Sequence, residues 1–417
     1  MTRDRKNHPA GQREILTKPF FILLSVSLVG LFFIAVRFTK GIGAVSNLSD
    51  GYPWGIWVAY DVAIGTAVTC GGFAVAILSY IMNRGEYHSL VKSAILTSLF
   101  GAFLAASSIL VEIGRPWNAY GGFFAPTSWQ PSSAFFELAL CAAGYLVALV
   151  IEYLPSILAA LGRGTPTSVR TLFLNFLARR RLVVLSPCAG PVPAATSLLT
   201  RRINALLICT AVAGILLPTM HQSALGSLML IASTKLHPLW HSPFLPLLFL
   251  VNCIYIGYAI VIFESVLSSF VQGRNFRSDQ LAAVGRMIPW LIAAWLVIRL
   301  GDIWNRDQVQ AVFHGDFYSI FFLAECFLMA IASIPLFSRE KRRSPRRLFI
   351  SAFMILLGGG LYRFNVYLIG FNPGSGWHYF PSFAEVMISA GIVSTEILAY
   401  QLLIKFLPPI PAGSVRY

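Results

Sequence analysis

Two short charged phrases, each at the end of a long apolar run, contain the first residues of this chain whose types and spacing could do chemistry. They are EIGRPWN, from Glu112 to Asn118, and RLGDIWN, from Arg299 to Asn305. Each phrase places an acid and a base three residues apart, which puts both side chains on one face of a helix. Ionisable groups inside a membrane are costly and usually paired, so they indicate either a functional site or an ion pair that fixes helix packing.

The first phrase is accompanied by further polar residues that would suit a quinone. GYPWGIWVAYD (51–61) and PTMHQS (218–223) supply aromatic rings, a carboxylate, an imidazole and an amide. The carbonyl oxygens of a quinone accept hydrogen bonds, and each reduction takes up two protons, which an imidazole or a carboxylate can relay. A capping or loop role is the alternative for the imidazole. The residues predicted to bind quinone or relay protons are Trp54, Tyr60, Asp61, Glu112, Arg115, Glu137, His221 and Gln222.

The second phrase belongs to another set of charged residues at similar depth. For this second bundle we favour an internal ion pair, with Trp117 and Trp304 of the two phrases as anchors at the membrane interface. Two other acids, Glu264 and Glu396, lie deeper in their apolar runs. They could form a proton path or be bonded to a neighbouring hydroxyl group, and the sequence favours neither. The charged cluster of the second bundle is predicted to contain Arg299, Asp302, Glu325, Arg363 and Glu385.

Haem, iron–sulfur clusters and metal ions are not expected in this chain. A b-type haem inside a helical bundle needs two axial ligands, usually histidines on facing helices. None of the seven histidines lies near the middle of an apolar run. The six cysteines include no CxxC pair and lie mostly within apolar runs, where we interpret them as small packing residues.

The elements that must position these residues are membrane-spanning helices. The chain is 56% hydrophobic and 12% charged over 417 residues, whereas a soluble protein is about a quarter charged. Apolar runs long enough to cross a bilayer occur at about 19–38, 54–82, 90–112, 132–154, 203–220, 244–270, 283–304, 317–337, 347–369 and 383–407. The prediction is an all-α polytopic membrane protein with about ten transmembrane helices.

The net charge of +15 is distributed between the loops in a way that predicts orientation. Basic residues dominate the N-terminal tail and alternate connections, such as 339–347, whereas the intervening loops carry few. By the positive-inside rule both tails, 1–18 and 409–417, are cytoplasmic, and the first apolar run is a retained span rather than a cleaved signal. The charge therefore sets topology and suits contact with membrane lipid, and nucleic acid is not needed as a partner.

The transmembrane domain, residues 19–408, contains a predicted tandem repeat of four spans. SAFFELALC contains Glu137 and SIFFLAECF contains Glu325, 188 residues further on, close to the offset between the two charged phrases. Repeat one covers about 54–220 and repeat two about 244–369, and an even number of spans makes the repeats parallel. A basic stretch rich in Pro, Gly, Ser and Thr, residues 155–202, is predicted to be a mobile cytoplasmic insertion.

Longer motifs carry a resemblance to a known family. YPWGIWVAYDVAIGT, NRGEYHSL, LLPTMHQSALGSL, KLHPLW, GDFYS and FNPGSGWHYFP resemble the NrfD/PsrC family of quinone-interacting membrane subunits, over about residues 19–408. Within that family, the chain is most similar to the HybB-type subunits, so-called cytochrome b subunits, of periplasmic nickel–iron hydrogenases. The 155–202 stretch is longer than we expect for that type of subunit, but the core motifs are intact.

The resemblance implies a subunit of the bacterial inner membrane that has no redox centre of its own. A periplasmic iron–sulfur ferredoxin-like subunit would dock on the outer loops, which are rich in Gly, Pro, His and aromatic residues, and pass electrons to menaquinone or ubiquinone. The large and small subunits of a nickel–iron hydrogenase would supply electrons from dihydrogen. Proton uptake from the cytoplasm would make the step electrogenic. A shallow cap without a protein partner is the alternative for the outer loops.

Three other functions remain open. The same quinone-linked role could serve another periplasmic redox enzyme, such as a multihaem cytochrome or a molybdoenzyme, which neighbouring genes would reveal. A secondary transporter also uses repeats and buried charges, although its polar residues would gather at the membrane midplane rather than near one face. A true cytochrome b would show a haem spectrum.

Overall fold

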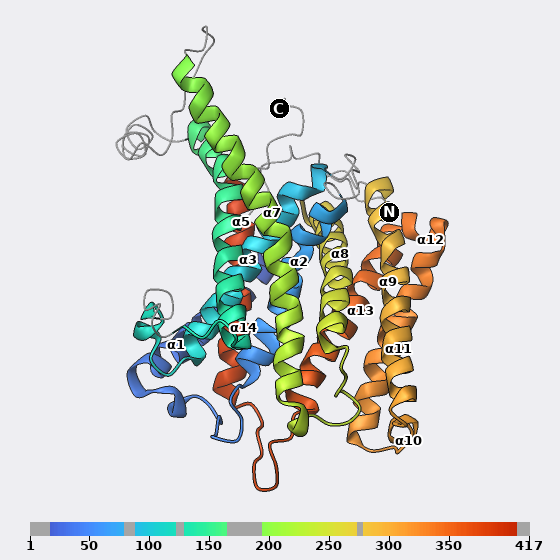
Figure 1. Ribbon diagram of the computed structural model, residues 1–417. Helices are drawn as coiled ribbons and strands as arrows, with labels where there is room; N and C mark the ends of the chain where they lie inside the picture. Colours follow the sequence, from blue (N-terminus) through green and yellow to red (C-terminus); the bar gives the residue numbers. More distant parts are fainter. Residues whose placement is uncertain (1–16, 79–87, 122–128, 165–193, 273–277, 407–417) are drawn as a thin grey trace.

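The computed structural model describes residues 17–78, 88–121, 129–164, 194–272 and 278–406, which form helices joined by loops (Figure 1). Ten helical segments in this part of the chain are long and apolar enough to cross a membrane. The predicted all-α class with about ten transmembrane helices is therefore confirmed. The long helices are α1 (Lys18–Lys40), α2 (Gly65–Ala76), α3 (His88–Glu112), α5 (Ala134–Gly164), α7 (Ala194–Ile231), α8 (Leu245–Gln272), α9 (Ser278–Asn305), α11 (Phe317–Phe337), α13 (Pro345–Phe364) and α14 (Phe383–Phe406).

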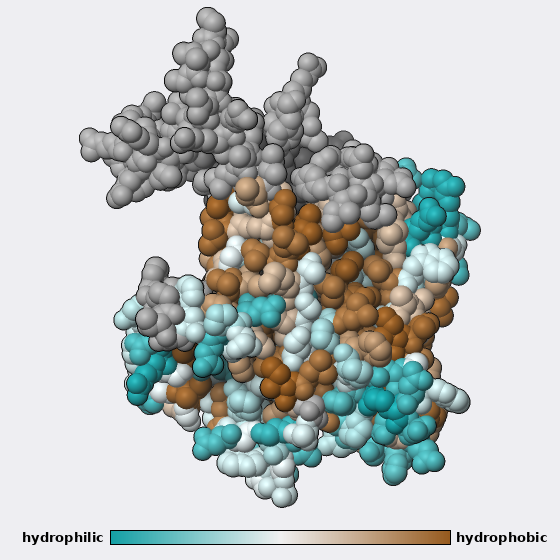
Figure 2. Space-filling model, viewed as in Figure 1, coloured by the Kyte–Doolittle hydropathy of each residue, from teal (hydrophilic) through white to brown (hydrophobic). Residues whose placement is uncertain are grey.

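Apolar side chains cover the middle of the molecule on the face shown in Figure 2, and hydrophilic residues gather at its lower end and over the short helix α12 (Arg339–Arg343). Helix α1 illustrates the pattern, because it exposes Phe21, Ile22, Leu31 and Phe32. Lipid tails are as apolar as these side chains, so a helix that faces lipid has no reason to bury them. The surface is that of a multi-pass integral membrane protein.

Eight of the long helices pack as two rings of four. In the first ring α2 packs against α3, α3 against α5, α5 against α7, and α7 against α2, and α8, α9, α11 and α13 form the second ring in the same order. The rings meet where α2 crosses α8. A Cβ atom on Gly257 would lie 2.6 Å from the carbonyl oxygen of Cys70, so this approach requires glycine. The rings contain the helices of the two predicted four-span units, and their origin by duplication stays a prediction.

Helices α1 and α14 pack against each other and flank the first ring. Gly30 and Gly391 lie at their crossing, where a Cβ on either would be 2.6 Å from the Cα of the other. Ser27 and Thr395 share a hydrogen bond of 2.7 Å between their hydroxyl groups. Helix α14 also contacts α3, so the last span of the chain covers the first ring.

Two π-helical segments join the rings at one end. They are η2 (Trp57–Val62), which leads into α2, and η8 (Asn365–Ile369), which follows α13. The Nη1 atom of Arg363 in the second ring donates to the Ala63 carbonyl, directly after η2, at 2.8 Å. In return the Nε1 atom of Trp54, just before η2, donates to the Tyr367 carbonyl in η8 at 2.9 Å. Since π-helical turns often occur at functional sites, this end of the molecule is of particular interest.

Some predicted boundaries were wrong. The fifth span was predicted to end at residue 220, but α7 continues through Pro218 to Ile231, so His221 and Gln222 lie inside a helix. Part of the predicted 155–202 insertion is helical, because α5 extends to Gly164 and α7 begins at Ala194. Residues 165–193 and most of both predicted tails lie outside the described residues.

Candidate functional site

Asp61 is the most deeply buried of the predicted site acids in the first ring, with 1% of its surface exposed. It lies in η2, and its Oδ2 atom accepts hydrogen bonds from Ser108 Oγ of α3 at 3.0 Å and from Ser389 Oγ of α14 at 2.8 Å. Its Oδ1 atom is buried without a hydrogen-bond partner. The two hydroxyl groups can stabilise the charged carboxylate, and the other oxygen is available to a proton, a water molecule or a ligand.

Glu112 lies one turn beyond Ser108, on the same face of α3. Its Oε1 atom accepts a hydrogen bond from the backbone N–H of Gly55 at 2.8 Å, and its Oε2 atom is buried without a partner. The end of α3 is held by Arg37 of α1, which donates to the carbonyls of Val111, at 2.5 Å, and Ile113. A cation at the C-terminus of a helix bonds carbonyls that have no partner within the helix. Arg37 therefore fixes the position from which Glu112 reaches the 55–61 segment.

Glu385 lies in the same region, which corrects its predicted place in the second bundle. Its Oε2 atom accepts hydrogen bonds from the backbone N–H groups of Asn47 and Ser382, at 3.0 and 2.7 Å, and its Oε1 atom accepts one from Tyr379 Oη at 2.6 Å. The sequence does not show which ring the last helix covers, and α14 packs against α1 and α3. Asp61, Glu112 and Glu385, here called the acid group, lie close enough for their charges to interact.

Tyr379 supplies a hydroxyl group beside the acid group, in the loop before α14. It donates to Glu385 and accepts a hydrogen bond from the backbone N–H of Ile56 at 2.9 Å. Burial and the neighbouring Glu385 carboxylate raise the pKa of Tyr379 above its usual value. Its phenol therefore stays protonated at neutral pH and acts as a hydrogen-bond donor.

Aromatic rings line the same end of the molecule. The Trp54 ring lies 4.8 Å from that of Phe371, and Tyr52 lies 5.7 Å from Phe371 and 5.5 Å from Tyr379, as centroid distances. Trp57 is fully buried and donates from Nε1 to the Glu385 carbonyl at 3.3 Å. Tyr60, by contrast, is 43% exposed. The acid group thus lies beside a cluster of aromatic rings that pack against one another.

His221 and Gln222 were predicted to share one space with Asp61, but their hydrogen bonds place them in a separate group. His221 Nδ1 is 3.2 Å from the Leu138 carbonyl of α5, and Gln222 Nε2 donates to Thr66 Oγ1 of α2 at 3.1 Å. Asp61 instead bonds α3 and α14, because residues five positions apart project from a helix in different directions. His221 Nε2 and Gln222 Oε1 are buried without partners, so this second group also has free hydrogen-bonding capacity.

Two predicted site residues of the first ring lie nearer the surface. Arg115 is exposed and Glu137 is half-buried. Glu112 bonds the Gly55 backbone instead of Arg115, and in the described residues the acid and base of the first phrase form no ion pair. The three-residue spacing was therefore misleading, since α3 ends between them at Glu112.

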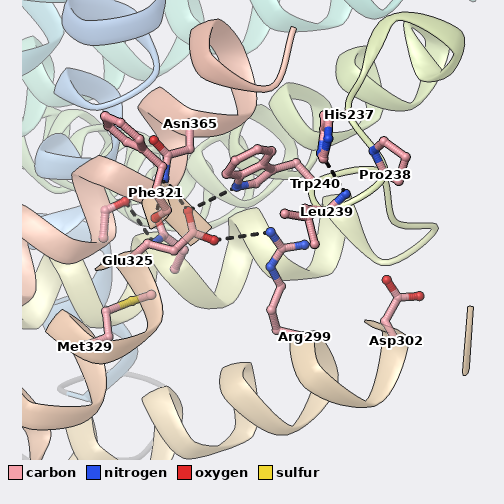
Figure 3. Close-up of polar contacts among 12 residues, drawn as sticks. His237, Pro238, Leu239, Trp240, Arg299, Asp302, Phe321, Glu325, Met329 and Asn365 are labelled. Carbon is pink, nitrogen blue, oxygen red and sulfur yellow. Dashed lines mark hydrogen bonds and ion pairs between the residues drawn. The ribbon is translucent and has the colours of Figure 1, made fainter. Parts of the chain in front are cut away.

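The second phrase also divides, as Figure 3 shows. Arg299 Nη2 of α9 contacts Glu325 Oε1 of α11 at 3.2 Å, and both side chains are fully buried. Glu325 Oε2 accepts hydrogen bonds from Trp240 Nε1 at 3.1 Å and from Asn365 Nδ2 at 2.7 Å. Asp302 pairs with Arg306 instead, at 2.8 Å. The geometry is that of an internal ion pair between neighbouring helices, which is the interpretation favoured for this bundle.

Arg363 connects the two rings. Besides the Ala63 carbonyl, it bonds Asn252 Oδ1 through Nε at 2.5 Å and the Phe249 carbonyl through Nη2 at 2.8 Å. It is fully buried, and these neutral oxygens, rather than a carboxylate, accept its hydrogen bonds. Because Ala63 is two residues from Asp61, the second ring holds the segment that carries the acid group.

The two deeper acids have different surroundings. Glu264 accepts a hydrogen bond from the Thr97 hydroxyl group, as in the alternative in which a neighbouring hydroxyl satisfies the carboxylate. Glu396 lies on α14 two turns beyond Ser389, on the same face, and its charge interacts with that of Asp61. Glu396 is therefore the better placed of the two to exchange protons with the acid group.

The fold and site define a polytopic helical membrane protein with a buried acid group at one end of its first helical ring. A model of the family described as "Polysulphide reductase, NrfD" matches residues 44–372. The chain belongs to the NrfD family.

The chain is similar to membrane subunits of several oxidoreductases. It is 36% identical to the probable Ni/Fe-hydrogenase 2 b-type cytochrome subunit of Escherichia coli, covering 95% of this chain and 94% of the relative. It is 22% identical to the integral membrane subunit of menaquinone reductase of Nitratidesulfovibrio vulgaris, covering 98% and 96%. It is also 21% identical to a selenate reductase subunit of Mesobacillus selenatarsenatis, covering 94% and 95%.

The donors described in this chain do not fit the b-type haem that the name of the E. coli relative implies for that protein. Two facing axial ligands would be needed. His221 is the one histidine within the described spans, and its Nδ1 atom already contacts the Leu138 carbonyl.

Proposed function

We propose that this chain is the quinone-reducing membrane subunit of a respiratory nickel–iron hydrogenase complex. It would lie in the bacterial inner membrane with both termini in the cytoplasm. Its transmembrane domain, residues 19–408, would comprise the two four-helix units, with a cytoplasmic insertion between α5 and α7. The substrate is menaquinone or ubiquinone, and the electrons come from dihydrogen.

The acid group carries this proposal. Reduction of a quinone to quinol takes up two electrons and two protons, so the site needs hydrogen-bond donors for the carbonyl oxygens and a source of protons. Asp61 and Glu112 each have a buried oxygen without a partner, which in the protonated acid can donate a hydrogen bond to a carbonyl oxygen, and Tyr379 holds Glu385 beside them. The rings of Tyr52, Trp54 and Phe371 provide apolar surface beside them. Asp61 and Glu112 would relay the protons.

The electrons would enter from the end of the molecule at which the acid group lies. A periplasmic iron–sulfur ferredoxin-like subunit would dock on the outer loops and receive electrons from the large and small hydrogenase subunits. The similarity to the E. coli hydrogenase subunit supports this partner set. The similarity to menaquinone and selenate reductase subunits supports the alternative, in which the same quinone site serves another periplasmic redox enzyme.

Glu396 would connect the acid group to the cytoplasmic side. It is half-buried, and the face of α14 that carries it also carries Glu385 and Ser389. If the protons of quinol came through this face from the cytoplasm while the electrons came from the periplasm, the reaction would move charge across the membrane.

The test replaces Asp61 by Asn in the intact complex. Dihydrogen-dependent reduction of a menaquinone analogue should fall by at least about a hundredfold, because removing a positioned acid–base group has an effect of this size. Dihydrogen-dependent reduction of a soluble dye, which bypasses the membrane subunit, should not change. Asp302→Asn is the matched control, since Asp302 is only 4% exposed but lies in the second ring with Arg306.

Equal loss of quinone reduction in both variants, or full activity in Asp61→Asn, would contradict the assignment of the site. Mass spectrometry of the purified wild-type complex separates the two partner sets. Hydrogenase subunits in the complex would support the proposal. A different redox enzyme in their place would leave the proposed quinone site unchanged, but dihydrogen would no longer be the electron donor.

A further inference from the structure

Basic residues gather at the end of the second ring opposite the charged phrase of α9. Four of them, here called the arginine patch, are Arg286 of α9 and Arg339, Arg342 and Arg343 of α12. Helix α12 connects two membrane-spanning helices, α11 and α13, and forms the hydrophilic area at the upper right of Figure 2. The patch therefore lies where a spanning helix ends.

Arg342 is the buried member of the patch, with 9% of its surface exposed. Its Nη1 atom donates to the carbonyls of Leu336 and Phe337 at the end of α11, and its Nε atom is buried without a partner. Burial and the positive charges of Arg286 and Arg339 lower the pKa of Arg342. Helices α9 and α12 pack against each other, so the patch residues share one end of the second ring, and Arg342 keeps one donor without a partner.

The nearby acids neutralise the positive charge of the arginine patch only in part. Arg343 pairs with Asp279 at 3.1 Å, in an exposed ion pair, and such pairs contribute little. Glu340 forms no ion pair within the described residues. It lines, with Arg339 and Arg343, a surface cavity of about 460 Å³. The cavity is large enough to admit a phosphate group, and the surrounding charge is predominantly positive.

An apolar surface continues from the patch along the membrane-spanning helices. Trp290 lies one turn beyond Arg286 on α9 and is 65% exposed. Its ring meets the edge of Phe337, the last residue of α11, at a centroid distance of 5.5 Å. Phe337 is 51% exposed. The cationic surface lies at the end of the spanning helices, and the exposed aromatic surface lies next to it along those helices. An anionic phospholipid has the matching arrangement, with a charged phosphate group at one end and apolar acyl chains next to it.

We propose that the arginine patch is a binding site for an anionic phospholipid. The phosphate group lies in the cavity that Arg339 and Arg343 line and accepts hydrogen bonds from guanidinium groups of the patch, which suit phosphate geometry. The acyl chains lie against Trp290 and Phe337. The site is separate from the quinone chemistry and does not rest on the function proposed above.

The experiment measures lipid binding to the purified full-length chain in detergent by native mass spectrometry. Phosphatidylglycerol, phosphatidylcholine of the same acyl chains, and inorganic phosphate are each titrated. The double variant Arg286→Ala with Arg339→Ala removes two exposed cations. The control, Lys40→Ala with Lys235→Ala, removes two exposed cations at the other end of the membrane-spanning helices. Thermal unfolding establishes that all variants are folded.

Wild type and control should bind phosphatidylglycerol in preference to phosphatidylcholine. The double variant should bind it about twenty-fivefold more weakly, because each cation near an anionic lipid contributes about a factor of five. Equal weakening in the control, or equal binding of both lipids, would overturn the proposal. Saturation by inorganic phosphate at the lipid concentrations used would also overturn it, since the site would then bind a free anion.

Discussion

The two helices that face η2 each carry one serine and one glutamate, one helical turn apart. Helix α3 presents Ser108 and Glu112, and α14 presents Glu385 and Ser389, each pair at a spacing of four residues. The serine of each pair bonds Asp61, and the glutamate of each pair reaches the segment before η2. A four-residue spacing keeps both members on one helix face. The site therefore consists of Asp61 between two serine–glutamate pairs, one on α3 and one on α14.

Tyr379→Phe tests the hydroxyl group that holds Glu385. The variant removes a donor to Glu385 and an acceptor for the Ile56 N–H, so unfolding should require about 1–2 kcal/mol less free energy. Quinone-linked turnover should fall about tenfold, because Glu385 then keeps only the hydrogen bonds to its Oε2 atom and its Oε1 atom loses its donor. Tyr120→Phe, at an exposed tyrosine, is the control and should change neither quantity. A wild-type rate in Tyr379→Phe would remove Tyr379 from the site.

The sequence predicted these residues unevenly. Asp61, Glu112 and Glu385 could be recognised because acids inside apolar runs are rare. Ser108, Ser389 and Tyr379 were missed, because a serine within a spanning helix usually bonds its own backbone, and its contact with an acid 47 or 328 positions away has no local signal. The four-residue spacing of the two serines from Glu112 and Glu385 was the one available indication.

The π-helical segments show how the elements position the site. Segment η2 turns Asp61 toward α3 and α14, and Arg363 and Trp54 bond the rings to each other on either side of it. The sequence predicted the spans on either side but not the π turns, since these runs are apolar on nearly all sides and have little helical periodicity for an extra residue to shift. The extension of α7 past Pro218 was also missed, because proline usually ends or kinks a helix and the span was predicted to end at residue 220, just after Pro218.

The crossing of α1 and α14 gives a prediction at the scale of the elements. Gly30→Ala places a methyl group 2.6 Å from the backbone of α14, and overpacking of this kind should lower the free energy of unfolding by about 1–3 kcal/mol. Gly301→Ala is the matched control, because nothing lies within 4 Å of its Cβ position on α9. This second variant should be more stable by about 0.5–1 kcal/mol, since alanine favours a helix.

Thermal unfolding in detergent measures both glycine variants. The midpoint should fall for Gly30→Ala and rise for Gly301→Ala. A fall of equal size in both would show that any methyl group added to a spanning helix lowers stability in detergent, and that the contact with Gly391 does not determine the result.

The two groups of charged residues that carry the proposals lie at opposite ends of the molecule. The acid group and the aromatic residues around it lie at the end that the positive-inside rule assigns to the periplasm, and the arginine patch lies at the other end. Composition and loop charge were enough to predict the class and the number of spans. They could not predict which ring α14 would cover, because that choice depends on contacts such as Ser389 with Asp61 between residues far apart in sequence.

Cysteine labelling tests the orientation. In a variant without its natural cysteines, His314→Cys in the loop before α11 should react with a membrane-impermeant maleimide on intact cells. Lys341→Cys in α12 should react only after the membrane is permeabilised. Both positions are exposed, so accessibility to solvent does not separate them. The reverse labelling pattern would invert the molecule and place the acid group at the cytoplasmic side.

The pairing of α1 with α14 also constrains how the protein is made. Ser27 and Thr395, which bond each other, are separated by 368 positions, so nearly all of the chain leaves the ribosome before α1 meets its partner. Until then α1 lies in the membrane without this partner. Helix α14, which carries Glu385 and Ser389, is the last of the described helices to be made, and it completes the acid group. Assembly of the site is therefore a final step of biosynthesis, and a chain cut short before α14 would contain Asp61 but no completed site.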